Sequence, residues 1–274
     1  MERLQSLGAT GADERGTAEI WKALVELWRP GTPDGYYRGR RLVIDLNNAE
    51  GRAQMLVLAN LLAARVAEHV AESTFMALGA AGLLDRDRLL AGSAADRERA
   101  LEILRDTYRA LTDKERKIEA IYANQARLAN EFDGDLHNVY LAAAGDDEKL
   151  LKMLHGFAHL RQRAFWLARE MKVSGVWPDL GTRVTAYYDV HIRRSLVRLG
   201  FSRLGETDDW LASRHECQKI VDNLFGGDVI PFYLHGSRLC FHNDRTICES
   251  SCPVKQRCSF WREYPNDDPD LGVD

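Results

Sequence analysis

The sequence predicts an all-α protein, and two observations carry that prediction. Apolar residues recur at intervals of three and four from about Ala53 onward, whereas the only strand-like segment is 41–46. Capping residues and glycines also stand where helices of that pattern would begin and end. With 45% apolar side chains among 274 residues, the chain is long enough to bury a substantial core.

The first elements follow from apolar spacing. A short helix is expected around residues 21–28, and the apolar stretch 53–67 is too short to cross a bilayer, so it predicts a buried helix. The clearest helix is predicted over 113–132, where Thr112 and Glu115 form a capping box. An N-terminus without an apolar core segment predicts no secretory signal. We therefore expect a cytoplasmic protein, associated with the nucleoid if the source is bacterial, that contacts no membrane.

A tight helical hairpin is predicted at residues 155–158. Asp146 opens the first of its two helices, the second is expected to leave the turn at once, and Gly175 closes it. Such a turn can aim backbone N–H groups at a phosphate, as helix N-termini do. Tight helix pairs are also common structural units, so the hairpin alone indicates little about function.

Another helix is predicted between Asp189, at its N-cap, and Gly200, at its C-terminal end. Capping by itself explains an isolated aspartate at a helix start. Arg193, Arg194 and Arg198 follow on this helix and form either a basic stripe or an ordinary solvated face. The formal net charge of −4 does not indicate a nucleic-acid binder, so only a local concentration of basic residues can carry that function.

Four of the five cysteines lie close together near the C-terminus. Cys240, Cys248, Cys252 and Cys258 are separated by seven, three and five residues, and Cys217 stands apart as an expected core residue. Four thiolates on one short segment can surround a single metal centre. Only the Cys248–Cys252 pair has the spacing of a zinc knuckle, and staggered spacings suit a four-iron cluster, but both metals stay open on spacing alone.

Three segments, taken in order, resemble the helix-hairpin-helix DNA glycosylases of the endonuclease III type. The segment 154–158 is similar to that family's hairpin, and 188–192 with Arg194 is similar to its catalytic motif. The segment 234–236, which leads into Cys240, resembles the approach to the first ligand of the family's iron–sulfur cluster. The similarity extends from about residue 53 to 261.

The resemblance implies a two-lobed helical fold with a DNA cleft between the lobes. Residues 1–49 would form an N-terminal extension that packs on the cluster lobe, 50–172 a helical barrel that ends in the hairpin, and 173–274 the lobe with the catalytic aspartate and the cluster. The four cysteines would hold a [4Fe–4S] cluster, with zinc as the alternative. The partner would be double-stranded DNA with a damaged or modified base, bound by a monomer.

The resemblance also assigns roles to individual residues. Asp189 matches the catalytic aspartate, whose charge stabilises the positive charge that builds on the sugar as the base leaves. Tyr187 and Tyr188 could stack on the flipped base, or could be core residues. The residues expected to contact DNA are Gly156, Phe157, Ala158, His159, Arg161, Arg65, His191, Arg194, Arg245, Lys255 and Arg257.

Two departures from the family pattern bear on the reaction. Bifunctional members carry a Schiff-base lysine where this chain has Leu160, and Lys172 is too far along the helix to replace it. Ala158 stands in place of the second hairpin glycine. We therefore expect a monofunctional glycosylase; the alternatives are a bifunctional lyase with a displaced nucleophile and a non-catalytic nucleic-acid binding module on the same scaffold.

Overall fold

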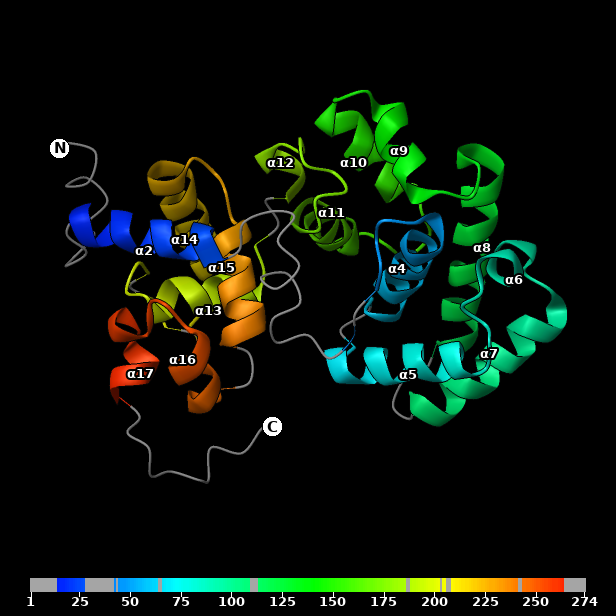
Figure 1. Ribbon diagram of the computed structural model, residues 1–274, viewed down its shortest axis with the longest axis horizontal. Helices are drawn as coiled ribbons and strands as arrows, with labels where there is room; N and C mark the ends of the chain where they lie inside the picture. Colours follow the sequence, from blue (N-terminus) through cyan, green and yellow to red (C-terminus); the bar gives the residue numbers. More distant parts are fainter. Residues whose placement is uncertain are drawn as a thin grey trace. The chain divides into compact units, whose positions relative to one another are not determined.

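The computed structural model describes residues 14–27, 42, 44–63, 66–108, 113–185, 188–202, 204–205, 208–240 and 243–263. Over these residues the chain is helical and contains no strand, which confirms the all-α prediction (Figure 1). The strand predicted at 41–46 is wrong in its described part, because residues 42, 44 and 45 are irregular and Leu46 begins a turn.

The chain divides into two compact units. We call Arg41–Val184 the hairpin unit, and Met1–Arg40 together with Thr185–Asp274 the cysteine unit. The division falls after Val184, within the short helix 182–185, whereas the expected boundary was at residue 172.

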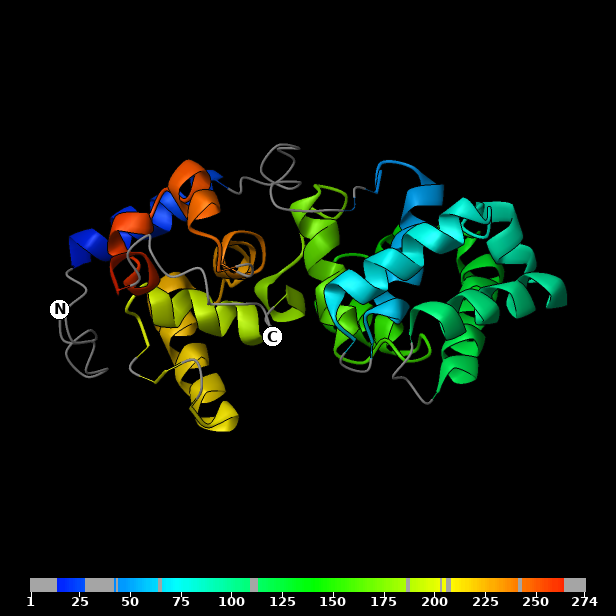
Figure 2. The same cartoon turned by 90° about the horizontal axis from the view of Figure 1, so that it is seen from below.

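The hairpin unit is built around helix α4 (Ala49–Leu61), which is apolar on nearly every side and buried along most of its length. Its neighbours include α5, α6, α8, α9 and α11, and Figures 1 and 2 show it among them. The buried helix predicted from residue 53 is therefore confirmed as far as Leu61. The other helices of this unit are α5 (Glu68–Ala80), α6 (Arg86–Ala91), α7 (Ala94–Thr107), α8 (Lys114–Phe132), α9 (Leu136–Ala143), α10 (Asp147–His155), α11 (Arg163–Val173) and α12 (Thr182–Thr185), whose last residue lies past the division.

Local signals fixed the ends of several of these helices. Helix α8 begins one residue after the expected start and ends where Asp133 takes a left-handed conformation, with φ 52°. Its N-cap Asp113 makes no side-chain capping bond, and Thr112 of the predicted capping box lies outside the described residues. Asp146 caps α10 as expected, by accepting a hydrogen bond from the Lys149 amide at 3.0 Å.

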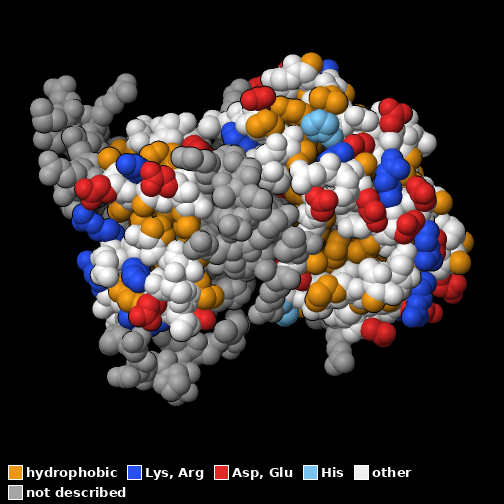
Figure 3. All heavy atoms as spheres, in the orientation of Figure 1, with side chains coloured by type: hydrophobic (Ala, Val, Ile, Leu, Met, Phe, Trp, Pro, Cys, Tyr) orange, Lys and Arg blue, Asp and Glu red, His pale blue; other side chains and the backbone are white. Residues whose placement is uncertain are grey.

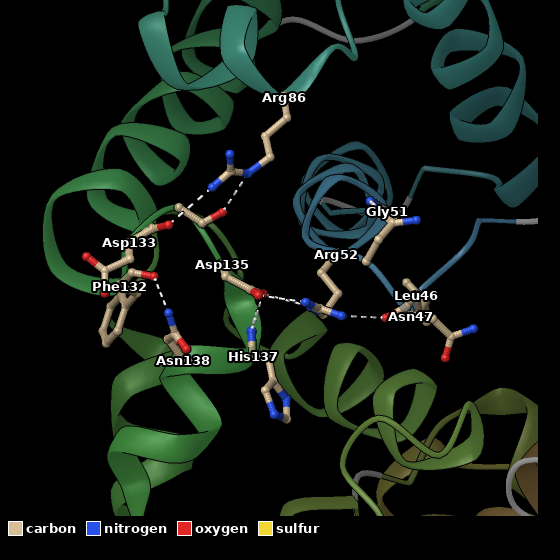
Figure 4. A network of polar contacts seen from close by, with 12 residues as sticks. Leu46, Asn47, Gly51, Arg52, Arg86, Phe132, Asp133, Asp135, His137 and Asn138 are labelled. Carbon is tan, nitrogen blue, oxygen red and sulfur yellow. Dashed lines mark hydrogen bonds and ion pairs between the residues drawn. The ribbon is translucent and has the colours of Figure 1, made fainter.

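A partly buried ion pair ties the start of α4 to the loop between α8 and α9 (Figure 4). Arg52 donates two hydrogen bonds to Asp135, at 2.7 and 2.6 Å, and a third to the Leu46 carbonyl at 2.9 Å. Asp135 also caps α9 through the His137 amide at 2.8 Å. Burial raises the pKa of the Asp135 carboxyl, but the hydrogen bonds from Arg52 and His137 outweigh burial, so the net pKa is lowered.

Asp135→Asn should destabilise the protein by about 2 kcal/mol at pH 7. The Arg52 side chain is only 11% exposed, and the substitution leaves this buried guanidinium without its counter-charge. Since folding lowers the pKa of Asp135, its contribution is complete above its ordinary pKa of 3.8 and is lost as the pH falls through the lowered value. Urea denaturation should therefore show a difference in the free energy of unfolding between wild type and variant, and this difference should shrink as the pH falls below 3.8. The control is Glu102→Gln, which removes a surface pair with Arg99 and should change stability by less than about 1 kcal/mol.

The cysteine unit is built around α13 (Val190–Arg198), which packs against helices α14 (Trp210–Phe225) and α15 (Ile230–Leu234) and the π-helical turn η1 (His235–Leu239). Helix α2 (Glu14–Leu27) packs on α15, and its Trp21 ring also stacks on Phe225, the last residue of α14, with centroids 4.9 Å apart. In Figure 2 the blue α2 lies near the red end of the described chain. Glu19 of α2 forms an ion pair with Arg257 in that segment, at 3.6 Å. The remaining elements are α16 (Arg245–Ser251), the 3₁₀ turn η2 (Lys255–Arg257) and α17 (Ser259–Glu263).

The surface of the hairpin unit carries both signs of charge. On the face drawn in Figure 3, acidic and basic side chains are interspersed. Ion pairs on this unit include Arg97 with Glu119 at 3.0 Å and Arg105 with Glu115 at 2.9 Å. None of the helices in the described ranges is both long and apolar enough to cross a membrane.

Candidate functional site

The hairpin turn is longer than the sequence predicted. Helix α10 ends at His155 and α11 begins at Arg163, so seven residues, 156–162, form the turn and the second helix does not leave at once. Phe157 and Leu160 point into the core, while Gly156, His159 and Arg161 are exposed. His159 and Arg161 have left-handed backbones, with φ 60° and 37°, which costs each about 1–2 kcal/mol. Burial of the two apolar residues between polar neighbours accounts for this strained path.

Two buried asparagines hold the turn by the backbone of Ala158. The Ala158 N–H donates to Asn124 Oδ1 at 2.6 Å, and the Ala158 carbonyl accepts from Asn124 Nδ2 at 2.9 Å and Asn60 Nδ2 at 3.1 Å. Asn124 also donates to Asn60 Oδ1 at 2.9 Å. The Ala158 N–H is therefore already satisfied inside the unit, so a contact of Ala158 with DNA, which stays a prediction, would not use this N–H. A polar Asn60 within the most apolar helix was the sequence signal for this contact.

Positive charge is concentrated around the exposed part of the turn. The pKa of the His159 imidazole is lowered, first by partial burial and then by the nearby charges of Arg116, Lys117 and Arg161. Lys117 is buried and donates to the carbonyls of three residues at the end of α4, at 2.9 to 3.0 Å. Burial, with a smaller effect of Arg163, lowers the pKa of Lys117 to about 8. The exposed members of this basic turn are His159, Arg161 and Arg116.

Gly156 is not required by the backbone conformation. Its φ of −71° suits any residue, and a Cβ there would meet only the movable guanidinium of Arg127, 2.4 Å away. The Arg127 guanidinium lies over the Phe157 ring at 4.6 Å and forms part of the turn's packing. A side chain larger than glycine is therefore compatible with folding at this position.

In the cysteine unit, Asp189 caps α13 as predicted. Its Oδ1 accepts from the backbone amides of His191 at 3.0 Å and Ile192 at 3.1 Å. The carboxylate is half-buried, and the neighbouring Val190 is exposed although apolar. The fold thus holds a carboxylate in one orientation at the N-terminal end of the helix around which this unit packs.

The arginines that follow on α13 do not form a solvated face. Arg193 is buried and donates to the carbonyls of Gly205 at 3.0 Å and Asp208 at 3.1 Å. Arg198 is also buried, donates to Asn243 Oδ1 at 2.7 Å and lies over the Phe260 ring at 4.5 Å. Both arginines therefore hold loops onto α13, whereas Arg194 is half-buried.

Two of the other residues expected at the DNA or in the base pocket, Tyr188 and His191, pack within the cysteine unit. Tyr188 is buried, which together with the charges of Asp222 and Cys217 raises its pKa, so it is a core residue rather than an open stacking surface. His191 is half-buried and meets the Tyr233 ring edge-on, with centroids 6.1 Å apart. Tyr187 and Arg65 lie outside the described residues.

The basic side chains near the cysteines are engaged within the unit. Arg245 donates to the Trp261 carbonyl at 2.8 Å and lies over the Trp261 ring at 4.2 Å. Lys255 lies over the same ring at 5.3 Å and donates to the Glu249 carbonyl at 2.6 Å. Arg257 pairs with Glu19 of α2, as described above. Within the described chain these three residues therefore stabilise the C-terminal segment of the unit.

The four clustered cysteines, which we call the cysteine centre, are all buried free thiols. Burial raises the pKa of Cys240 well above its ordinary value, the Arg198 charge opposes that rise, and the other three thiols add to it. Burial likewise raises the pKa of Cys252 to about 12, and Cys248 and Cys258 again contribute. The four thiols therefore lie within electrostatic reach of one another, while Cys217 packs in α14 as expected.

In the described parts of the chain, no three His, Cys, Asp or Glu side chains are close enough to hold one metal ion. The donor set of the cysteine centre nevertheless fits an iron–sulfur cluster, which takes one thiolate per iron. Burial excludes solvent and raises the pKa of Cys240 and of Cys248; the Arg198 charge opposes that rise and so offsets part of the cost of forming the thiolates that a metal requires.

His235 connects α13 to the cysteine centre, a role that the sequence did not indicate. Its Nδ1 lies 2.8 Å from Ser195 Oγ, and its Nε2 lies 3.5 Å from Cys252 Sγ and 3.6 Å from Cys240 Sγ. Complete burial, helped by the charge of Arg198, lowers the pKa of His235 to about 3, so the imidazole is neutral. The next residue, Gly236, lets η1 approach α13, because a Cβ there would lie 1.9 Å from the His191 carbonyl oxygen.

Comparison of the chain with models of protein families, with curated proteins and with solved structures found no match. Three features of the described residues can carry chemistry: a carboxylate fixed at a helix N-terminus, an exposed basic turn, and four buried thiols beside a neutral histidine.

Proposed function

We propose that this chain is a monofunctional DNA glycosylase, which flips a damaged or modified base out of double-stranded DNA and removes it by hydrolysis. The observation that carries the proposal is Asp189, whose Oδ1 is fixed by two amides at the start of α13. Its position in sequence, between the hairpin and the cysteine centre, is that of the catalytic aspartate in the glycosylases that the chain resembles. We propose that the protein acts as a monomer.

In this proposal Asp189 acts on the sugar of the flipped nucleotide. As the N-glycosidic bond breaks, its electron pair stays with the base and positive charge builds on the sugar, where the carboxylate stabilises it. The carboxylate also orients the water that attacks the sugar carbon, so that the hydroxyl bonds to that carbon and the remaining proton ends on the base. The two capping bonds keep the carboxylate in one orientation, which saves reorganisation during the reaction.

The exposed basic turn supplies the phosphate contacts. Arg161 and His159 lie on the turn, and Arg116 is within electrostatic reach of His159. Because the net charge of the chain is −4, the attraction for DNA in this proposal comes from the local charges of Arg161 and Arg116; the lowered pKa of His159 disfavours a charge on its imidazole.

Arg161→Gln should weaken duplex DNA binding about equally for all sequences and should reduce the slope of log K against log salt by about 1, since one phosphate contact is lost. Fluorescence anisotropy at several salt concentrations gives both values. The matched control is Arg99→Gln, which removes an exposed arginine of the same unit that pairs with Glu102. Equal salt slopes for wild type and Arg161→Gln would place the DNA contact elsewhere.

Hydrolysis rather than Schiff-base chemistry is favoured by the groups around the turn. Leu160, at the position of the lyase lysine, is buried and apolar. Lys117 donates to three carbonyls, and Lys172 donates to the Leu180 carbonyl. Borohydride treatment with abasic DNA should therefore trap no covalent adduct, and a trapped adduct would favour the bifunctional alternative.

The activity itself is tested with duplex oligonucleotides that each carry one damaged or modified base. After incubation, alkali cleaves the strand wherever a base has been lost, so a glycosylase produces a cut at the position of its substrate. The proposal expects such a cut for at least one duplex. Tight DNA binding without any cut across the panel would favour the non-catalytic binding module.

We further propose that the cysteine centre holds a [4Fe–4S] cluster, with Cys240, Cys248, Cys252 and Cys258 as ligands. The cluster would have a structural role and would tie α16 and η2 to the end of η1. Protein purified without oxygen should be brown and contain about four iron atoms per chain if each thiolate binds one iron. Stoichiometric zinc in a colourless protein would instead support the zinc alternative.

A further inference from the structure

His235 occupies a completely buried position between α13 and the cysteine centre. Both of its ring nitrogens have polar neighbours. Ser195 Oγ lies 2.8 Å from Nδ1 and Cys252 Sγ lies 3.5 Å from Nε2, whereas Cys240 Sγ lies beside the ring, 3.6 Å from Nε2 and 3.7 Å from Nδ1. Ser195 is itself buried on α13. The contacts form a chain from a helix hydroxyl, through an imidazole, to two of the four clustered thiols.

The backbone around His235 is arranged to make these contacts. His235 begins the π-helical turn η1, and the turn ends directly before Cys240, whose amide donates to the His235 carbonyl at 3.0 Å. Gly236 allows this turn to lie against the first turn of α13. Short π-helical turns inside helices occur frequently at functional sites, because they redirect side chains.

The contacts of the two ring nitrogens select one arrangement of protons. In an imidazole with one N–H, the other nitrogen carries a lone pair, and a serine hydroxyl can either donate or accept. If Nε2 carried the lone pair, that lone pair would face the Cys252 thiolate whenever the cysteines bind a metal. If Nε2 carries the proton, it donates toward sulfur and the Ser195 hydroxyl donates to Nδ1, so every polar group has a complementary partner.

We propose that His235 is a positioning residue for the cysteine centre: it donates a hydrogen bond from Nε2 to the thiolate of Cys252 and packs against Cys240, while Ser195 holds it in the required tautomer. This inference rests on the proposed cluster. The hydrogen bond would orient the Cys252 thiolate and reduce its electron donation to a bound iron. Through Ser195 it also fixes the cysteine centre to α13, the helix that begins at Asp189.

The test uses the full-length protein, purified without oxygen, with His235 replaced in two ways. His235→Leu removes the donor and keeps an apolar side chain, whereas His235→Gln places an amide N–H near the position of Nε2. His235→Leu should lose its cluster absorption in air about tenfold faster than wild type, since second-shell partners typically change metal affinity by 10–100-fold. Its reduction potential should also be more negative, because hydrogen bonds to sulfur help set the potential.

His235→Gln should recover most of the wild-type lifetime and potential, and Ser195→Ala should fall between wild type and His235→Leu. A purely structural role would not produce this order, because the potential responds to the hydrogen bond and Gln differs from His in shape. A His235→Leu protein with the wild-type potential and lifetime would overturn the proposal. A folded His235→Gln protein as impaired as His235→Leu would also overturn it, since that result indicates a ligand or packing role.

The readouts also separate this inference from the proposals on which it rests. Iron analysis of the wild type tests the cluster, and a wild type without iron would remove the cluster proposal together with the inference. Neither the lifetime nor the potential depends on base release. Failure of the glycosylase proposal would therefore leave this test intact.

Discussion

Asp189→Asn should abolish base release while leaving folding and DNA binding intact. Asparagine caps helices as well as aspartate does, and its amide oxygen can accept the same bonds from the His191 and Ile192 amides. The substitution removes the negative charge beside the sugar, and it removes the carboxylate that acts as general base and orients the attacking water. Single-turnover assays on a confirmed substrate should show a rate lower by at least about a thousandfold.

The matched control is Asp209→Asn, which changes another N-cap of the same unit. Asp209 caps α14 by accepting from the Ala212 amide at 2.8 Å and is exposed. Both variants should melt close to the wild type, but only Asp209→Asn should retain base release. If Asp189→Asn still excised the base at the wild-type rate, Asp189 would be a cap and nothing more.

Gly236→Ala should cause the largest loss of stability among the substitutions considered. A Cβ at this position would lie 1.9 Å from the His191 carbonyl oxygen and 2.5 Å from its carbon, so α13 and η1 would have to separate. Overpacking against backbone atoms that cannot rotate away should destabilise the protein by about 3 kcal/mol or more. Because the separation displaces His235 and Cys240, metal content should fall as well.

Thermal melting and metal analysis together check this prediction. The control is Gly79→Ala in α5, where the nearest atom to a new Cβ is Leu84 Cδ1 at 3.4 Å, an ordinary contact. Gly79 lies in the last turn of α5, where helix propensity favours alanine over glycine, so this control should melt at or slightly above the wild-type temperature. A Gly236→Ala protein that melts with wild type and keeps its metal would mean that η1 does not pack on α13 in this way.

Local signals explain why much of the helical layout was predictable. Asp146 and Asp189 cap helices at the expected residues, and Gly200 and Gly226 follow helices in left-handed conformations, with φ 77° and 62°. These signals act between residues close in sequence, so a single sequence contains them completely. All four clustered cysteines are buried, but so is the isolated Cys217, so burial alone does not distinguish a metal site from core thiols.

Contacts between distant residues explain most of what the sequence did not predict. Asn60 and Asn124 reach Ala158 across 98 and 34 residues: both donate to its carbonyl, and Asn124 also accepts from its N–H. His235 was visible as part of a motif, but its contact with Ser195, 40 residues away, was not.

Tertiary context also overrode two local patterns. The apolar residues Ile44 and Leu46 lead into α4 instead of forming a strand, and Arg52 donates to the Leu46 carbonyl there. Arg193 and Arg198 looked like a charged helix face, but both are buried, with partners in loops of the same unit. The loop partners of the two arginines lie 12, 15 and 45 residues away in the sequence, so the apolar periodicity of the helix does not reveal them.

The measurement that tests the central claim most directly is the release of free bases from DNA. Wild-type protein and Asp189→Asn are incubated in parallel with untreated DNA and with DNA that has been alkylated, oxidised or deaminated, and the small-molecule fraction is analysed by mass spectrometry. The account predicts that one base, or one chemically related group of bases, is released by the wild type and is absent with Asp189→Asn. Wild-type protein that binds all of these DNAs and releases no base, or a variant that releases the same base equally fast, would contradict it.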